Sequence, residues 1–175
     1  MSQPKVSGKF VEALAASAGA VSPVFEQKIE QYLRYNGIDS VDPGAWYSYE
    51  QFASAVTDVE EDIGSMTAMD AGAEMIATAE EIADMSSIAE TMELAQDVHS
   101  AAYRNFTPDA VGQWSHEYTD TGNSRIAAYG GWRYPQGFTQ GIVKGYAKAS
   151  NDVVQAEITE TATTSDEVFA FVVQS

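Results

Sequence analysis

Residues 125–173 read RIAAYGGWRYPQGFTQGIVKGYAKASNDVVQAEITETATTSDEVFAFVV, and this stretch decides the fold class. The runs RIAAY and GWRY predict strand, interrupted by a bend or bulge at Gly130 and Gly131. Pro135 opens a helix over GFTQGIVKGYAKAS, and the runs VVQAEIT and EVFAFVV predict two strands joined by a loop at 161–166. We therefore expect a β-α-β-β tail that forms an antiparallel sheet.

Helix signals dominate the sequence before residue 120. Ser22 and Pro23 are a typical N-cap and first helical residue, and Gly37 ends the helix that they begin. The apolar stripe of this helix consists of Phe25, Ile29, Tyr32 and Leu33. Helical spacing of apolar residues recurs in three later stretches, which are residues 52–63, 66–76 and 88–106.

Thr107 and Pro108 predict one more helix, with Val111, Trp114 and Tyr118 on its inner face. The polar turn TDTGNS then separates a helical part, residues 1–120, from the β-α-β-β part, residues 121–175. The pattern predicts a single α+β domain over residues 1–175, whose helical N-terminal two-thirds precede an antiparallel sheet. A chain of this length can bury a core without disulfides or metals.

The charge balance excludes several classes of partner. The chain has 26 Asp and Glu against 9 Lys and Arg, a net charge of −17, and no Cys. Such an excess repels duplex DNA and anionic membranes, so we expect neither a nucleic-acid nor a membrane partner. Without Cys there are no disulfides, thiolate zinc sites or Cys nucleophiles. The sequence has no apolar run of about 20 residues and no hydrophobic signal core at its start, which predicts a cytoplasmic protein.

No Lys or Arg lies between Arg34 and Arg104, so many carboxylates have no basic neighbour in sequence. At low ionic strength this surface repels itself, whereas at about 1 M salt the Debye length falls to roughly 3 Å. The composition is typical of a halophile that keeps its cytoplasm salty, and it predicts that concentrated KCl stabilises the fold. The alternative is an ordinary acidic domain or a partner-binding surface.

Three glycines recur every four residues in the predicted C-terminal helix, at Gly137, Gly141 and Gly145. This spacing places them on one helical face, where they allow a backbone to approach closely. Each interior glycine costs about 0.5–1 kcal/mol relative to alanine. We therefore expect close packing, or a ligand, to compensate for them.

Arginines are scarce, and three of the four, Arg104, Arg125 and Arg133, lie within thirty residues that are rich in aromatics. An Arg fork binds carboxylates, and aromatic planes can flank a flat or apolar ligand. We expect a pocket for an anionic small molecule, with Arg125 and Arg133 as polar anchors and Trp132 and Tyr134 as walls. The alternative is that the arginines pair with the plentiful carboxylates and that the aromatics form core.

Only two histidines are present. His99 falls on the apolar stripe of the predicted helix at 88–106, so its imidazole is expected to point inward. It is either a hydrogen-bonded core residue or the axial ligand of a haem iron. His116 lies off the stripe of its predicted helix and is expected at the surface, paired with Glu117 or Asp120.

No motif identifies a reaction: the sequence contains no HExxH, GxSxG, Walker loop, EF-hand or GxGxxG. No Ser, His and Asp set is supported by spacing either. We therefore name no catalytic residues and favour a non-enzymatic protein.

Six segments carry a further signal, and their order covers nearly the whole chain. They are KVSGKFVEAL at 5–14, FEQKIEQYLRYNGID at 25–39, WYSYEQFASAV at 46–56, AYRNFTPDAVGQW at 102–114, YPQGFTQGIVKGY at 134–146 and VVQAEITETATTSDEVFAFVV at 153–173. Read together, they resemble the haem nitric-oxide-binding and 4-vinyl-reductase-like superfamily of small-molecule-binding domains.

The resemblance implies a fold that encloses a small ligand between helices and sheet. In the haem-binding branch an axial His stands on a helix, for which His99 is the match, and a Tyr-x-Ser-x-Arg motif holds the propionates. Here the corresponding stretch reads YTDTGNSRIAAY, where Ser124 and Arg125 are adjacent and the motif is broken. The vinyl-reductase branch carries Cys residues that suggest a metal site, and this chain has none.

The leading hypothesis is a non-enzymatic small-molecule-binding or sensory domain with a pocket between helices and sheet and no predicted cofactor. A second is a haem-based gas sensor with His99 as axial ligand. A third is a protein-interaction module or homo-oligomeric scaffold, such as a homodimer. For the first we expect that Arg133→Ala weakens binding of an anionic ligand without unfolding the domain.

Overall fold

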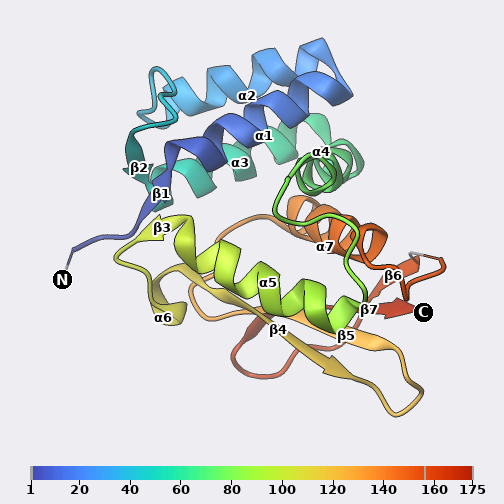
Figure 1. Ribbon diagram of the computed structural model, residues 1–175. Coiled ribbons are helices and arrows are strands. Elements are labelled where there is room, and N and C mark those ends of the chain that lie inside the picture. Colours follow the sequence, from blue (N-terminus) through green and yellow to red (C-terminus); the bar gives the residue numbers. More distant parts are fainter. Residues whose placement is uncertain (1, 156, 175) are drawn as a thin grey trace.

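The computed structural model describes residues 2–155 and 157–174 and has an α+β fold (Figure 1). The helices in this part of the chain are α1 (Gly8–Val21), α2 (Pro23–Tyr35), α3 (Tyr49–Ile63), α4 (Ser65–Ala77), α5 (Ile88–Ala101), α6 (Pro108–Val111) and α7 (Gln136–Ala149). The strands are β1 (Lys5–Ser7), β2 (Trp46–Ser48), β3 (Tyr103–Arg104), β4 (Gln113–Tyr118), β5 (Ser124–Tyr129), β6 (Glu157–Glu160) and β7 (Glu167–Gln174). The predicted fold class is confirmed.

Hydroxyl side chains cap most of the helices. The Ser22 hydroxyl accepts a hydrogen bond from the Val24 amide at the start of α2, and Gly37, with a φ of 92°, follows the end of this helix. The helix predicted from Ser22 to Gly37 is thereby confirmed, as are those expected within 52–63 and 66–76. The α7 helix has no side-chain cap of its own: Glu60 from α3 accepts from the amides of Gly137 and Phe138 instead, at 3.0 and 2.8 Å.

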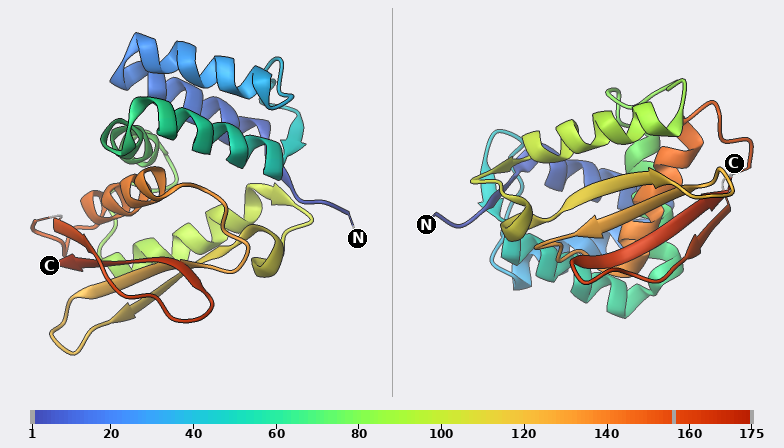
Figure 2. Two further views of the ribbon diagram at one scale, coloured as in Figure 1. Left: turned by 180° about the vertical axis from the view of Figure 1, so that it is seen from behind. Right: turned by 90° about the horizontal axis from the view of Figure 1, so that it is seen from below.

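The C-terminal strands form an antiparallel sheet in the order β4-β5-β7-β6, which confirms the expected β-α-β-β tail of β5, α7, β6 and β7 (Figure 2). The small antiparallel sheet β2-β1-β3 was not expected. It joins the aromatic loop at 46–48 to the start of the chain and to the end of α5.

The helix predicted from Thr107 through Tyr118 is wrong. Thr107 does cap a helix, but α6 ends at Val111 because Gly112 has a φ of 93°, and the chain then continues as β4. Pairing with β5 over the whole of β4 outweighs the helical spacing of Trp114 and Tyr118.

Three predicted boundaries also need correction. The α5 helix stops at Ala101, so Phe106 lies beyond it. The run GWRY is not a strand, because β5 ends at Tyr129 and Gly130, with a φ of 74°, turns the chain against α6. Strand β6 begins at Glu157, later than the predicted start at 153, and Ala156 lies outside the described residues.

The layers are arranged so that α1, α2 and α3 lie on one side, the sheet and α5 lie on the other, and α4 and α7 lie between them (Figures 1 and 2). One hydrophobic cluster runs through these layers from Val6 in β1 to Val173 in β7. No described helix is both long and apolar enough to cross a bilayer.

Candidate functional site

A cavity of about 730 Å³ lies between α1, α5 and α7. Its walls come from Phe10 and Ala13 on α1, from the end of α4 and the segment after it, and from the last turn of α5. The residues that line it are Ser7, Lys9, Phe10, Ala13, Met75, Ile76, Thr78, Ala79, Glu80, Glu81, Ile82, Val98, His99, Ala101, Ala102, Trp114, Trp132, Tyr134, Ile142 and Tyr146. Cavities that hold small ligands commonly have volumes of about 300–1,000 Å³.

Aromatic rings form the floor of this main cavity. Trp132 lies 4.5 Å from Trp114 and 5.5 Å from Tyr134 between ring centroids, and both contacts are edge-on. The Trp132 indole N–H donates to the Thr139 hydroxyl at 2.9 Å, and the Tyr134 and Tyr103 hydroxyls are 2.6 Å apart. These bonds fix both rings, and both residues line the cavity.

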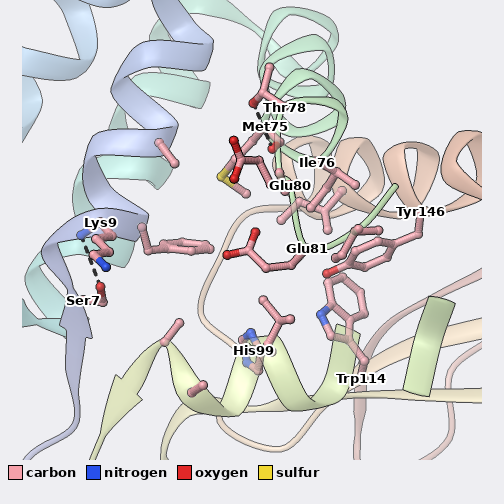
Figure 3. A pocket seen from close by; sticks show the side chains of 18 of the residues that line it. Ser7, Lys9, Met75, Ile76, Thr78, Glu80, Glu81, His99, Trp114 and Tyr146 are labelled. Carbon is pink, nitrogen blue, oxygen red and sulfur yellow. Dashed lines mark hydrogen bonds between the residues drawn. The ribbon is translucent and has the colours of Figure 1, made fainter. Parts of the chain in front are cut away.

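Tyr146 extends this floor along α7. Its ring meets Trp114 edge-on at 5.6 Å, and its hydroxyl faces the cavity (Figure 3). Burial raises the pKa of Tyr146, although the Trp114 indole opposes that rise. The phenol is therefore protonated at neutral pH and can donate a hydrogen bond to a bound molecule.

His99 is buried in the last turn of α5 and has 7% of its surface exposed. Its ring stacks on Trp132 at 5.3 Å and meets Tyr103 and Phe106 edge-on at 4.9 and 5.9 Å. Burial lowers the pKa of His99 to about 4, so the imidazole is neutral near pH 7. His99 is an inward-facing residue, as expected.

The hydrogen bond that His99 makes determines its tautomer. Its Nε2 lies 3.2 Å from the carbonyl oxygen of Gly112, which can only accept, so Nε2 carries the proton. The neutral ring then has a lone pair on Nδ1. No described residue donates a hydrogen bond to that atom. Every fully buried side-chain nitrogen or oxygen of the described residues has a hydrogen-bond partner, so Nδ1, which has none, is not fully buried. Nδ1 is thus an acceptor open to the cavity.

Charged residues surround the mouth of the cavity. Lys9 stands on α1, while Glu80 and Glu81 stand opposite, in the segment between α4 and α5; Glu81 reaches over the cavity (Figure 3). All three side chains are exposed, and none forms an ion pair within the described residues. The segment is fixed at Met85, whose amide donates to the Ala149 carbonyl at 2.9 Å.

The arginines are not at this cavity. Arg125 projects from β5 and makes two hydrogen bonds to Glu167, which lower the pKa of Glu167 to about 2. Arg104 stacks over Trp46 at 4.4 Å. Arg125 thus pairs with a carboxylate, as in the alternative that the sequence left open, whereas Arg104 contacts an aromatic ring.

Arg133 lines a separate cavity of about 230 Å³ and lies 3.6 Å from Glu50, with both side chains exposed. Its backbone amide donates to the Tyr49 hydroxyl at 2.8 Å. The Tyr-x-Ser-x-Arg motif has a closer partial match here than near residue 124: the residues are Tyr129-Gly130-Gly131-Trp132-Arg133, and Gly131 stands in the Ser position. The guanidinium of this match belongs to the smaller cavity.

The three glycines of α7 face α4 and not a ligand. A Cβ on Gly141 would lie 2.1 Å from the Met69 carbonyl oxygen, and one on Gly137 would lie 2.6 Å from that of Ser65. A Cβ on Gly145 would meet Ile76 at 2.5 Å. Helix packing therefore explains Gly137, Gly141 and Gly145, and none of them lines the main cavity.

His116 is half-buried on β4, where its Nε2 lies 3.1 Å from the Ser124 hydroxyl. The expected surface pairing with Glu117 or Asp120 is not formed. Sequence reasoning also missed Phe10, Tyr146 and the residues at the cavity mouth. Tyr146 was detectable, because it lies on the apolar face of α7, but the mouth is assembled from segments far apart in sequence.

No protein-family model and no curated protein matches this sequence. Solved structures do match it. An H-NOX protein from S. oneidensis in the Fe(II)NO state superposes with a TM-score of 0.63 at 12% identity, covering 97% of this chain and 99% of that one. The fold is that of the H-NOX proteins.

Two other solved structures agree. An Fe(II) unliganded mutant H-NOX protein from K. algicida gives a TM-score of 0.64 at 12% identity, with coverage of 97% and 96%. An oxygen-binding H-NOX domain related to soluble guanylate cyclases gives 0.59 at 12% identity, with coverage of 94% and 88%. At this identity the likeness to H-NOX proteins shows the fold alone.

One solved structure with this fold is described by the distortion of its haem porphyrin, but the residues that line the cavity of this chain do not suit haem. Because Nε2 is bonded to the Gly112 carbonyl, the nitrogen of His99 that remains available is Nδ1. Nδ1 is bonded to the ring carbon that carries Cβ, so a porphyrin bound through it would lie close to the backbone of α5. Two propionates at the mouth would meet Glu80 and Glu81 with Lys9 as the sole cation of the lining. The volume of the cavity and the neutral imidazole of His99 favour haem binding, but the position of the free His99 nitrogen and the negative charge at the mouth oppose it.

Proposed function

We propose that this chain is a non-enzymatic, sensory small-molecule-binding domain that holds its ligand in the main cavity. The observation that carries this proposal is the cavity itself, which combines about 730 Å³ of space with a fixed aromatic floor and an unused acceptor on His99. A mostly apolar cavity with a few convergent polar groups is typical of small-molecule sites.

The polar groups of the lining support binding more than catalysis. The Ser7 hydroxyl caps α1 by accepting from the Lys9 amide, and the Thr78 hydroxyl donates to the Glu74 carbonyl. Neither is hydrogen-bonded to His99, so the lining has no nucleophile paired with a base.

Native mass spectrometry tests the proposal. The full chain, purified without denaturation from molar KCl, is expected to carry a non-covalent small molecule. Ala13→Phe places a ring into the cavity from α1 and should abolish the adduct, whereas Ala16→Phe, on the exposed side of the same helix, should keep it. A bare mass for both the wild type and Ala16→Phe, or an adduct that survives in Ala13→Phe, would contradict the proposal.

A haem-based gas sensor is the second candidate, because solved proteins with this fold include an oxygen complex and an NO complex. Addition of haemin to the purified protein tests it. A Soret band that disappears in His99→Gln would support haem ligation at His99. A protein that stays colourless, or a band unchanged by the substitution, would remove this candidate.

A further inference from the structure

We propose that the main cavity takes a flat, largely apolar molecule that carries a positive charge and N–H donors. This inference rests on the proposed function and names the chemical class of its ligand. It reverses the anionic ligand that the arginine positions suggested.

The shape of the ligand follows from the floor. Trp114, Trp132, Tyr134 and Tyr146 present rings that are held by one another and by hydrogen bonds, and Phe10 closes the opposite wall from α1. Rigid aromatic surfaces bind planar ring systems and attract cations placed over their faces.

The donor on the ligand follows from His99. Because Nε2–H is used by Gly112, the imidazole can only accept from a molecule in the cavity, through Nδ1. A ligand that lacks a donor would leave this acceptor without a hydrogen bond, which costs binding free energy.

The charge of the ligand follows from the mouth. Glu80 and Glu81 face Lys9 there, so the lining carries a net charge of −1 within a chain of net charge −17. The cations that could have reversed this sign, Arg104, Arg125 and Arg133, all lie outside the lining. An anion is therefore repelled at the mouth and a cation is attracted.

Three probes of the same ring system separate the possibilities: proflavine, a planar cation with amino N–H groups; acridine, which is uncharged at pH 8; and acridine-9-carboxylate, an anion. Binding is followed by quenching of tryptophan fluorescence, at the lowest KCl concentration where circular dichroism shows the full chain folded, because higher salt would screen the exposed carboxylates at the mouth. Proflavine should bind roughly tenfold more tightly than acridine, and the carboxylate should bind most weakly.

Paired variants locate the effect. Glu80→Gln with Glu81→Gln should weaken proflavine binding about fivefold, while Glu61→Gln with Glu93→Gln, two exposed carboxylates outside the lining, should change it less than twofold. His99→Gln keeps a polar atom near Gly112 but leaves no acceptor at the Nδ1 position, and should weaken binding. His99→Asn places its amide oxygen near that position and should restore part of it.

The inference is overturned if the carboxylate binds as tightly as proflavine, or if both pairs of Glu variants have the same effect. It is also overturned if no probe binds while native mass spectrometry still finds a retained molecule, and in that case the proposed function stands. If no probe binds and no molecule is retained, both fail.

Discussion

At the scale of single residues, burial determines what His99 does. The imidazole lies among Trp132, Tyr103 and Phe106, and its one N–H donates a hydrogen bond to a backbone carbonyl. A residue placed in this way contributes an acceptor to the cavity, and it also makes the stability of the fold depend on pH.

Acid should destabilise the fold through His99. Its pKa falls from 6.5 to about 4 on folding, so below pH 6.5 the unfolded chain binds a proton that the folded chain does not. The free energy of unfolding should therefore decrease as the pH falls through this window, by on the order of 3 kcal/mol for a group this buried.

Urea unfolding of the wild type and of His99→Gln, at pH values within and above this window, measures the effect. The variant should lose most of the dependence. His116→Gln is the matched control. Burial also lowers the pKa of His116, but this residue is only half-buried, so the control variant should lose less of the pH dependence than His99→Gln does. Equal pH dependence in His99→Gln and in the wild type would contradict the account.

The sequence predicted some residues of the site and not others. The inward position of His99 follows from helical periodicity, and Trp132 and Tyr134 follow from aromatic clustering. The positions of the arginines could not be predicted, because the sequence does not tell which face of β5 Arg125 is on. In the structure Arg125 faces Glu167 on the neighbouring strand and not the cavity. Closeness in sequence did not imply a shared cavity.

At the scale of elements, the contact of α7 with α4 supports the floor of the cavity. A glycine on α4 makes the same close approach to α7. A Cβ on Gly72 would be 2.6 Å from the Phe138 carbonyl oxygen. The two helices thus touch through their backbones, which fixes Ile142 and Tyr146 on the other face of α7.

Gly141→Ala should destabilise the protein by about 1–3 kcal/mol or more, because its Cβ would overlap the Met69 carbonyl and backbone cannot move aside cheaply. Gly19→Ala, within α1, is the control: there the new Cβ meets only the end of the flexible Glu26 side chain, at 2.8 Å, and helix propensity favours alanine. Thermal melts should show a loss for the first variant and none for the second. A Gly141→Ala protein as stable as the wild type would contradict the packing.

Element prediction succeeded where local signals agreed with tertiary structure and failed where pairing decided the outcome. Ser22, Pro23 and Gly37 delimit α2 by their own conformational preferences. The segment QWSHEY of β4 fits a helix or a strand by pattern, and only the β5 partner makes it a strand.

At the scale of the whole molecule, acidic groups outnumber basic ones, and the described residues form ion pairs at few places. Lys28 binds Asp62, Arg125 binds Glu117 and Glu167, and Arg133 binds Glu50. The chain carries 26 acidic residues, so most carboxylates face solvent without a cation. The halophilic character remains a prediction of this charge distribution.

Concentrated KCl should raise the melting temperature, on the order of 10 °C between roughly 0.1 and 2 M, because it screens the repulsion between carboxylates. Melts in sucrose of equal osmolality are the control, since sucrose stabilises folds without screening charge. Equal gains in both solutes, or no gain in KCl, would contradict a halophilic adaptation.

One measurement tests the cavity most directly: a crystal structure of the full chain, purified in molar KCl without dialysis or denaturation. We predict electron density above Trp132 and beside His99 that no protein atom accounts for, within hydrogen-bond distance of the His99 Nδ1. Density showing Glu81, Ile82 and Phe10 collapsed onto the aromatic floor, with no space between them, would contradict the account.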